Sequence, residues 1–399
     1  MKTISIIGGG ASALILACEL DPKKYSVSVF DKNSALGRKF LVAGGGGFNL
    51  THSENEKDFI LKYTPNDFFK PAFSHFSNID FINWLNKIGI ETFVGTSGRV
   101  FPKKGIKPID VLQKIENKIK ANQVAINFKY EWTGFADDNS LKFKTPTGNK
   151  EIKSEIIIFC LGGASWPVTG SSGNWLNFFK EKNINAIPFK ASNCSFKIEW
   201  PKEIIKIIEG KPLKNISIKC NNKINFGEVV LTTFGMEGSG IYPLSPQIRE
   251  HLEKEGKAKI SLDLKPLLSF EECIKRISEN KTKLSYTENI AKQLNLNKVQ
   301  LVLLKSKMNK EMFLEPVKVV NNLKALELEI SALGPVEDAI STVGGISLNE
   351  ISKKFELKKL KNNFAIGEML DYDAPTGGYL LQSCFSMGKF LADYLNKVE

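Results

Sequence analysis

The sequence predicts an α/β fold in which one parallel sheet is assembled from both ends of the chain and interrupted by inserted segments. Three observations carry this prediction. Residues 3–31 follow the order strand, helix, strand; Ile156 to Leu161 is continuously apolar; and a short strand that ends in Gly and an acid, Phe364 to Glu368, precedes a helical pattern. Continuous apolar runs are typical of parallel strands buried on both faces, and alternation of strands with helices is typical of a parallel sheet.

Composition places the chain among globular proteins. Its 399 residues are 42% hydrophobic, which allows a large core and two or three structural units. The net charge is +12, but the lysines are dispersed and only four of the 55 basic residues are arginines, so a dedicated nucleic-acid surface is not favoured. The six cysteines are scattered without metal-ligand spacing, which predicts neither a disulfide framework nor a metal site.

The apolar run from Ile4 to Cys18 resembles the core of a signal peptide. However, it contains three consecutive glycines and continues into charged residues where a cleavage site is expected. No other stretch reaches the roughly 18 apolar residues that a membrane-spanning helix requires. We therefore expect a cytoplasmic protein with no membrane segment.

The first strand, Thr3 to Ile7, leads into a glycine-rich loop that opens a helix, and a second strand ends at Asp31. Gly8 permits a tight turn, Gly10 lets the backbone approach a pyrophosphate, and the Asp31 carboxylate can accept hydrogen bonds from a ribose diol. A glycine turn serving packing alone would leave Asp31 unexplained. The segment predicts a Rossmann-type dinucleotide site with Gly8, Gly10, Ala11, Ser12, Ala13, Asp31 and Lys32.

The next glycine-rich segment favours FAD over NAD. Gly44, Gly45 and Gly46 belong to four successive glycines, which leave room for a flat, bulky ligand against the backbone. Arg38 and Lys39 can offset pyrophosphate charge, and Asn49 can hydrogen-bond the polar edge of an isoalloxazine ring. The alternative is a flexible surface loop.

A third contact region follows the apolar run that ends at Leu161. Residues 127–135, 141–145 and 150–153 read as short strands with a turn at 146–149. Gly162 and Gly163 then end the apolar run, as expected where the backbone passes close to a cofactor. Trp132 is placed to touch an adenine, with core packing as the equal alternative.

The C-terminal segment completes the predicted site. Gly367 and Glu368 end a short strand and are followed by Asp371, and Gly377 and Gly378 precede a helical pattern from Tyr379 to Leu395. The N-terminus of this helix can direct N–H groups at a flavin carbonyl or a phosphate. A closing helix of this kind suits the length of FAD.

Together these motifs resemble the YhiN-like or BaiN-like flavoprotein family, which is related to aminoacetone oxidase. The resemblance covers nearly the whole chain. It includes Gly-Arg-Val-Phe-Pro at 98–102, Gly-Gly-Ala-Ser-Trp-Pro at 162–167, Gly-Gly-Ile at 344–346 and Ala-Pro-Thr-Gly-Gly-Tyr at 374–379. The signatures Glu-Gly-Ser at 237–239 and Asn-Cys-Ser-Phe at 193–196 resemble those of a separate branch of that family.

The resemblance implies a glutathione-reductase-like FAD domain interrupted by a β-barrel-like domain and a small helical domain. We expect residues 1–190 and 335–399 to form the FAD domain, 191–265 and 319–334 the β-rich insert, and 266–318 the helical insert. Capping boxes at Ser269 and Ser285 open helices, and the helical pattern persists to about Lys307.

The working hypothesis is an oxidoreductase in which a flavin exchanges hydride with a small organic substrate or with NAD(P)H. No second G-x-G-x-x-G lies between two strands, so a nicotinamide nucleotide would visit the flavin only transiently. Glu237, His52 and Tyr379 are candidate acids or bases, with structural hydrogen bonding as the alternative. Two other hypotheses are a flavin-dependent tRNA-modifying enzyme and a non-catalytic flavin-binding redox protein.

Overall fold

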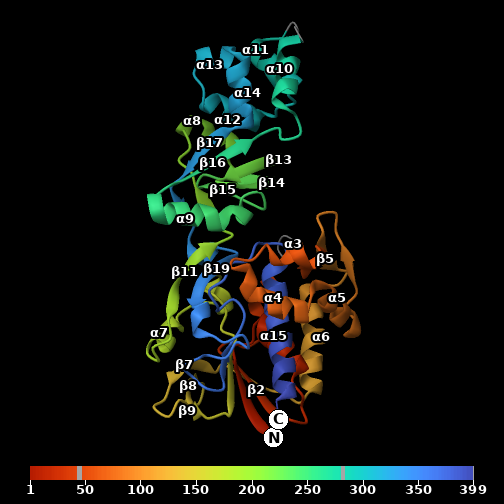
Figure 1. The fold of residues 1–399 in the computed structure, drawn as a ribbon, viewed down its shortest axis with the longest axis vertical. Coiled ribbons are helices and arrows are strands. Elements are labelled where there is room, and N and C mark those ends of the chain that lie inside the picture. The colour runs from red at the N-terminus through yellow and green to blue at the C-terminus, as the bar shows by residue number, and fades with distance from the viewer. Residues whose placement is uncertain (43–46, 280–283, 399) are drawn as a thin grey trace. The chain divides into compact units, whose positions relative to one another are not determined.

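A computed structural model describes residues 1–42, 47–279 and 284–398 (Figure 1). The chain forms two compact units, which we call unit 1 (Met1–Ala191 and Val336–Glu399) and unit 2 (Ser192–Pro335). Unit 1 therefore contains both ends of the sequence. The further division of the insert into a β-rich part and a helical part stays a prediction.

A five-stranded parallel sheet with the order β20-β10-β1-β2-β6 forms the centre of unit 1. Its central strand, β1, pairs Ile4 with Ile156 on one side and with Val27 on the other. The strands are β1 (Lys2–Ile7), β2 (Tyr25–Asp31), β6 (Ala125–Phe128), β10 (Ile156–Phe159) and β20 (Asn363–Ala365). All four residues of β10 are buried, as expected for a strand inside a parallel sheet. The predicted α/β class is confirmed.

The chain leaves this sheet earlier than the sequence pattern predicts. The single strand expected over 127–135 is instead two strands, β6 and β7 (Glu131–Phe135). Lys129 between them has φ +61°, and its N–H donates to the Asn33 carbonyl oxygen at 3.0 Å. This left-handed residue turns β7 into a separate antiparallel sheet with β8 (Leu141–Thr145) and β9 (Gly148–Ile152).

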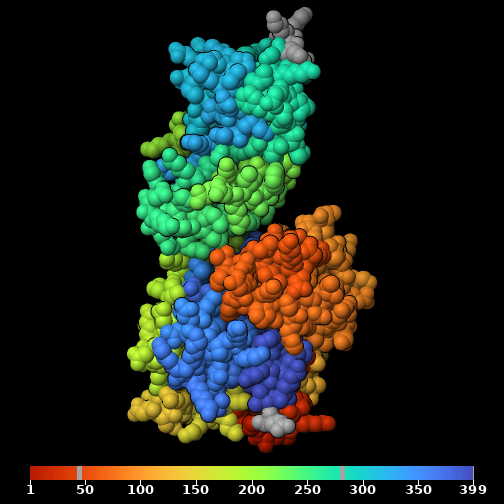
Figure 2. All heavy atoms as spheres, in the orientation of Figure 1, coloured from red at the N-terminus to blue at the C-terminus, as the bar shows by residue number. Residues whose placement is uncertain are grey.

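Helices α1 (Ala11–Glu19) and α15 (Tyr379–Lys397) pack against each other, and α15 also contacts α4 and α5. Figure 2 shows this side of unit 1 with all side chains, where the orange residues of α4 adjoin the dark blue C-terminal segment. The other helices of unit 1 are α2 (Arg38–Val42), α3 (Glu56–Ile60), α4 (Asn66–His75), α5 (Asn78–Lys87), α6 (Pro108–Ala121) and α7 (Leu176–Lys180). Two small sheets accompany them: β3 (Thr51–His52), β5 (Arg99–Pro102) and β4 (Thr92–Val94) in one, and β11 (Ala186–Ser192) with β19 (Ser341–Ile346) in the other.

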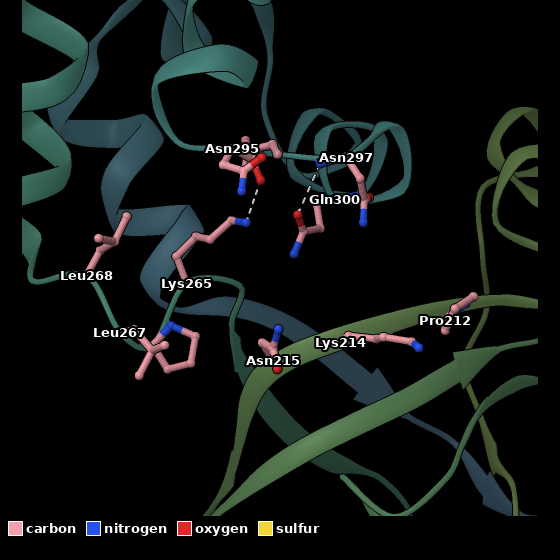
Figure 3. Close-up of a pocket in the computed structure, with 11 residues that line it drawn as sticks. Pro212, Lys214, Asn215, Lys265, Leu267, Leu268, Asn295, Asn297 and Gln300 are labelled. Atoms are coloured by element: carbon pink, nitrogen blue, oxygen red, sulfur yellow. Dashed lines mark hydrogen bonds between the residues drawn. The ribbon is translucent and has the colours of Figure 1, made fainter.

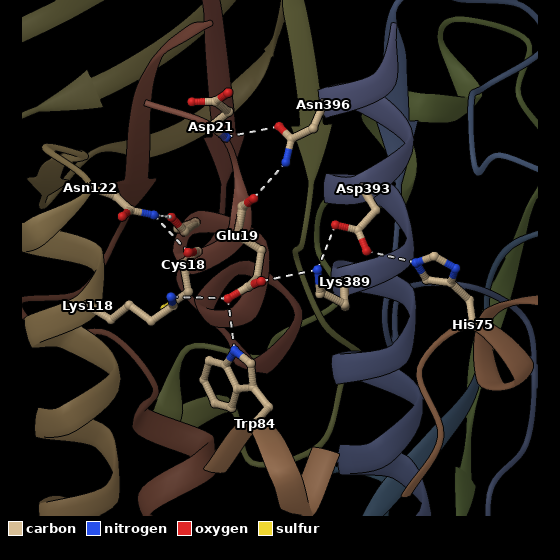
Figure 4. A network of polar contacts seen from close by, with 11 residues as sticks. Cys18, Glu19, Asp21, His75, Trp84, Lys118, Asn122, Lys389, Asp393 and Asn396 are labelled. Atoms are coloured by element: carbon tan, nitrogen blue, oxygen red, sulfur yellow. Dashed lines mark hydrogen bonds and ion pairs between the residues drawn. The ribbon is translucent and has the colours of Figure 1, made fainter. Parts of the chain in front are cut away.

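A polar network joins the C-terminal end of α1 to four other helices (Figure 4). Its centre is the Glu19 carboxylate, which accepts a hydrogen bond from Trp84 Nε1 at 2.8 Å and pairs with Lys389 at 3.1 Å. The further ion pairs are Glu19–Lys118, Lys389–Asp393 and His75–Asp393. The network ties α1 directly to α15, which comes from the opposite end of the sequence, and links α1 to α5 and α6 and α15 to α4.

Unit 2 contains a seven-stranded sheet with the order β17-β16-β13-β14-β15-β12-β18. Every pairing in it is antiparallel. The strands are β12 (Phe196–Lys197), β13 (Lys211–Cys220), β14 (Lys223–Leu231), β15 (Gly235–Glu237), β16 (Ala258–Asp263), β17 (Leu326–Ile330) and β18 (Ala332–Leu333). The two edge strands, β17 and β18, are separated in sequence by Ser331 alone, so the sheet curls back on itself into a nearly closed barrel.

The helices of unit 2 extend further along the chain than the pattern predicts. They are α8 (Lys202–Ile208), α9 (Ser245–Glu255), α10 (Phe270–Glu279), α11 (Tyr286–Gln293), α12 (Lys298–Ser306), α13 (Lys310–Leu314) and α14 (Pro316–Lys324). The capping box at Ser285 is formed. Asn309 caps α13 and Pro316 opens α14, so helical structure continues past Lys307. Within the described ranges, no helix is long and apolar enough to cross a membrane.

Candidate functional site

The glycine loop after β1 forms the first part of the site. Gly8 has φ +95°, and a Cβ there would lie 2.4 Å from the Cys160 carbonyl oxygen, so a side chain would have to displace the backbone after β10. Gly10 differs, because its φ of −81° suits any residue and a Cβ there would lie 3.9 Å from that same oxygen. The packing of the protein therefore does not require glycine at position 10, and the open space fits a ligand that approaches the backbone.

The N-terminus of α1 adjoins this open space. Gly10 is the N-cap residue of α1. Among the residues that the structure describes, no side chain caps this helix N-terminus, and the first turn, Ala11 to Ala13, has no acidic residue. The N–H groups at the start of a helix attract anions when no side chain satisfies them. The donors and the space beside Gly10 thus fit a pyrophosphate.

Asp31 lies at the end of β2 and contacts the loop directly. Its Oδ2 accepts a hydrogen bond from the Gly9 N–H at 2.7 Å, and its Oδ1 accepts from the Asn33 N–H at 2.7 Å. Arg38 in turn donates to Asn33 Oδ1 at 2.7 Å. Sequence reasoning missed Asn33, although an amide two residues after the acid is the signal that could have found it. The Asn33 side-chain amide also donates to Oδ1, at 2.9 Å, so Oδ2 is the oxygen that retains a second lone pair with which Asp31 can accept from a ribose hydroxyl.

A partly buried ion pair joins four segments that are distant in sequence. Lys39 Nζ lies 2.9 Å from Glu368 Oε2 and donates to Ser165 Oγ at 2.6 Å. The Thr342 N–H donates to Glu368 Oε1 at 3.3 Å, and a Cβ on Gly163 would lie 2.1 Å from Thr342 Oγ1. A side chain at Gly163 would therefore clash with the hydroxyl group of Thr342, which lies on β19. The predicted role of Lys39 toward a pyrophosphate stays a prediction, since its charge here faces Glu368.

The C-terminal segment meets the start of the chain at two glycines. A Cβ on Gly367 would lie 2.3 Å from Ser12 Oγ, which places the end of β20 against the first turn of α1. Gly378, with φ +97°, precedes α15, and a Cβ there would lie 2.6 Å from the Thr51 Cα. Among the described residues no side chain caps α15, and its first turn has no acidic residue. Its N-terminus therefore offers N–H donors, as α1 does.

Tyr379, the first residue of α15, stacks on His52 with ring centroids 5.4 Å apart. Burial raises the pKa of the Tyr379 phenol well above its usual value, and the neighbouring Glu54 carboxylate raises it further. The Glu54 N–H donates to His52 Nδ1 at 3.2 Å, so the proton of the neutral ring is on Nε2, which donates to the Ser97 carbonyl oxygen at 3.0 Å. The two candidate proton donors of unit 1 thus lie together.

The remaining predicted residues are less closely tied to this arrangement. Trp132 is buried against Phe135, Phe159, Phe178 and Phe179, the contacts of a core residue, and contact with an adenine stays a prediction. Lys32 Nζ donates a hydrogen bond to Ser172 Oγ. The backbone N–H of Asn49 donates to the Gly47 carbonyl oxygen, and that of Asp371 donates to the Ile346 carbonyl oxygen. Gly377 lies just before Gly378, and Glu237 lies on β15 of unit 2. Gly44, Gly45 and Gly46 lie outside the described residues.

A Rossmann-type sheet, an acid at the end of β2 and, among the described residues, two helix N-termini without a side-chain cap fit a dinucleotide cofactor. Together with the family match that follows, they make unit 1 that of an FAD-dependent oxidoreductase, and its cofactor is FAD. The chain belongs to the family described as HI0933-like protein Rossmann domain, whose model matches residues 2–394. This match confirms the resemblance that the motifs predict.

Three relatives of assigned function match along nearly their whole length. Ribosomal RNA dihydrouridine synthase from Haemophilus influenzae is 25% identical over 388 residues, covering 96% of this chain and 95% of that protein. Ribosomal RNA dihydrouridine synthase from Escherichia coli is 23% identical, covering 96% and 94%. The 3-dehydro-bile acid delta(4,6)-reductase from Clostridium scindens is 20% identical, covering 97% of each chain.

One solved structure shows the shared fold. The 3-ketosteroid-delta4-(5alpha)-dehydrogenase from Rhodococcus jostii RHA1 aligns over 99% of this chain and 96% of that chain. The TM-score is 0.52 at 10% sequence identity. The likeness is one of fold.

Proposed function

We propose that this oxidoreductase reduces a carbon–carbon double bond conjugated to a carbonyl group, and that its substrate is uridine within RNA. The observation that carries the proposal is the full-length match to two ribosomal RNA dihydrouridine synthases, 95% and 94% of whose chains are covered. The bile acid reductase is likewise matched over 97% of its chain, and it also has a double bond as its target. In dihydrouridine the C5=C6 bond of uracil has gained one hydride and one proton.

The hydride and the proton come from different groups. FAD, when bound and reduced by NADH or NADPH, would supply the hydride, which carries both electrons of the reduction. The chain supplies two things: hydrogen-bond donors that hold the cofactor, and the proton that is added to the carbon next to the carbonyl. Among the candidate acids, Tyr379 suits the second task, because its raised pKa keeps the phenol protonated at neutral pH.

His52 is less suited to donate that proton. In the neutral ring the Nε2 proton is given to a backbone carbonyl, that of Ser97, whereas the Tyr379 phenol is hydrogen-bonded to a titratable side chain, Glu54; the imidazole also stacks on Tyr379. A carbanion next to a carbonyl is a much stronger base than a phenolate, so a weakly acidic phenol is sufficient to protonate it. We therefore assign the proton to Tyr379 and positioning of the phenol to His52.

The test is a half-reaction with the purified holoenzyme. The flavin is reduced anaerobically with NADH or NADPH, the excess donor is removed, and uridine-containing RNA is added. We expect the yellow absorbance to return and the digested RNA to contain a nucleoside heavier than uridine by two hydrogens. A flavin that stays reduced with RNA but is reoxidised by a 3-keto steroid with a conjugated double bond would instead assign a small organic substrate.

A further inference from the structure

Unit 2 contains a pocket of about 500 Å³ that is distant in sequence from every predicted cofactor residue. Three segments line it: residues 212–215 of β13, the loop 265–268 after β16, and residues 295–300 at the start of α12 (Figure 3). Figure 3 shows Asn215 rising from β13 and Gln300 reaching from α12 into the same space. All these segments belong to unit 2, so the pocket is complete within it.

Local backbone features build the wall on β13. The pairing of β13 with β14 is irregular between Leu213 and Ile216, and Asn215 has φ +53°. This β-bulge interrupts the alternation of the strand, so that Lys214 and Asn215 are both exposed. Two consecutive polar side chains are thereby available at one rim of the pocket.

The opposite wall is held by hydrogen bonds. Asn297 caps α12 by accepting from the Gln300 N–H, and the buried Gln300 donates through Nε2 to the Leu264 carbonyl oxygen at 3.3 Å. Lys265 Nζ donates to the Asn295 carbonyl oxygen, and burial lowers the pKa of this lysine. A partly buried cation is therefore fixed beside the amide side chains.

The chemistry of the lining fits one nucleotide. The lining residues of the described chain include two lysines and four amide side chains, and none is acidic. Lys214 Nζ lies 3.8 Å from the carboxylate of Glu228, a loose ion pair. Lysines attract phosphate, amides pair with the edges of unstacked bases, and Leu267, 87% exposed, offers an apolar surface to a base. Unit 2 as a whole has 23 Lys and Arg against 17 Asp and Glu.

We infer that this pocket binds one unpaired nucleotide of the RNA substrate other than the uridine that is reduced. Its phosphate would lie between Lys214 and Lys265, and its base against Leu267 and the amide of Asn215. The inference rests on the proposed function, because it takes the substrate to be RNA. It adds a second contact site, on the insert, to the site of reduction.

Binding of a fluorescein-labelled, single-stranded oligouridylate to the holoenzyme tests the inference by anisotropy at several salt concentrations. The double variant Lys214→Gln/Lys265→Gln is compared with Lys219→Gln/Lys259→Gln, which removes two exposed lysines of the same sheet outside the pocket. For two lost phosphate contacts, the slope of log K against log salt should become shallower by about 1.4. The control variant should keep the wild-type slope.

A second variant guards against a folding defect at Lys265. Asn215→Gly removes the amide at a left-handed position that glycine favours, so the fold is retained. Its affinity for the oligouridylate should fall several-fold with an unchanged salt slope. Wild-type affinity and slope in both pocket variants would overturn the inference, even if the wild-type enzyme forms dihydrouridine. Absence of dihydrouridine from every RNA would instead refute the proposed function.

Discussion

Replacing Gly10 with alanine separates cofactor binding from folding. The added Cβ meets the Cys160 oxygen at 3.9 Å, an ordinary contact, and the backbone at Gly10 needs no change. The free energy of unfolding of the apoprotein should therefore change by less than about 0.5 kcal/mol. The same methyl group occupies the space that we assign to the pyrophosphate, and displacing one charge-assisted hydrogen bond costs about 1.5–3 kcal/mol.

That cost corresponds to a roughly ten- to hundredfold weaker affinity for FAD, at about 1.4 kcal/mol per factor of ten. Urea unfolding of the apoprotein measures the first quantity, and titration of the apoprotein with FAD, followed by flavin fluorescence, measures the second. Gly8→Ala is the contrasting variant, because its Cβ would lie 2.4 Å from a backbone oxygen at φ +95° and the apoprotein itself should be destabilised. Wild-type affinity for FAD in Gly10→Ala would refute the placement of the pyrophosphate.

Three further predictions concern charge and protonation. Lys39→Met leaves the buried Glu368 carboxylate without its cation, so urea unfolding should show a loss of about 2–3 kcal/mol. Burial opposes ionisation of Asp393, but hydrogen bonds, first from Lys389, lower the pKa of its carboxyl below 3.8. The ionised Asp393 carboxylate stabilises the folded protein fully above the pKa that Asp393 has in the unfolded chain, and this stabilisation is lost as the pH falls through its lower pKa in the folded protein. In urea titrations, the difference in free energy of unfolding between wild type and Asp393→Asn should therefore shrink below about pH 4. Tyr379→Phe should slow reoxidation of the reduced flavin by RNA about a hundredfold in stopped-flow measurements while FAD affinity is unchanged, and an unaltered rate would exclude the phenol as the proton donor.

Much of the fold was predictable because its signals are local. The strand, glycine loop and helix from Lys2 to Glu19 follow one another without interruption, and the buried strand β10 reads as one apolar run. The break between β6 and β7 was not predictable in this way. It depends on the left-handed Lys129, whose N–H is held by the Asn33 carbonyl from another part of unit 1.

A dinucleotide loop with an acid at the end of the next strand can be read from the amino-acid sequence of this chain, because backbone conformation and short spacing specify both. In contrast, the contact of Lys39 with Glu368 and the space that Gly163 leaves for Thr342 were visible only in the folded chain. The same is true of the pocket that Lys214 and Lys265 share. The physical reason is that such pairs join side chains separated by long stretches of chain, and neither periodicity nor composition records which distant segments the packing of a core brings into contact.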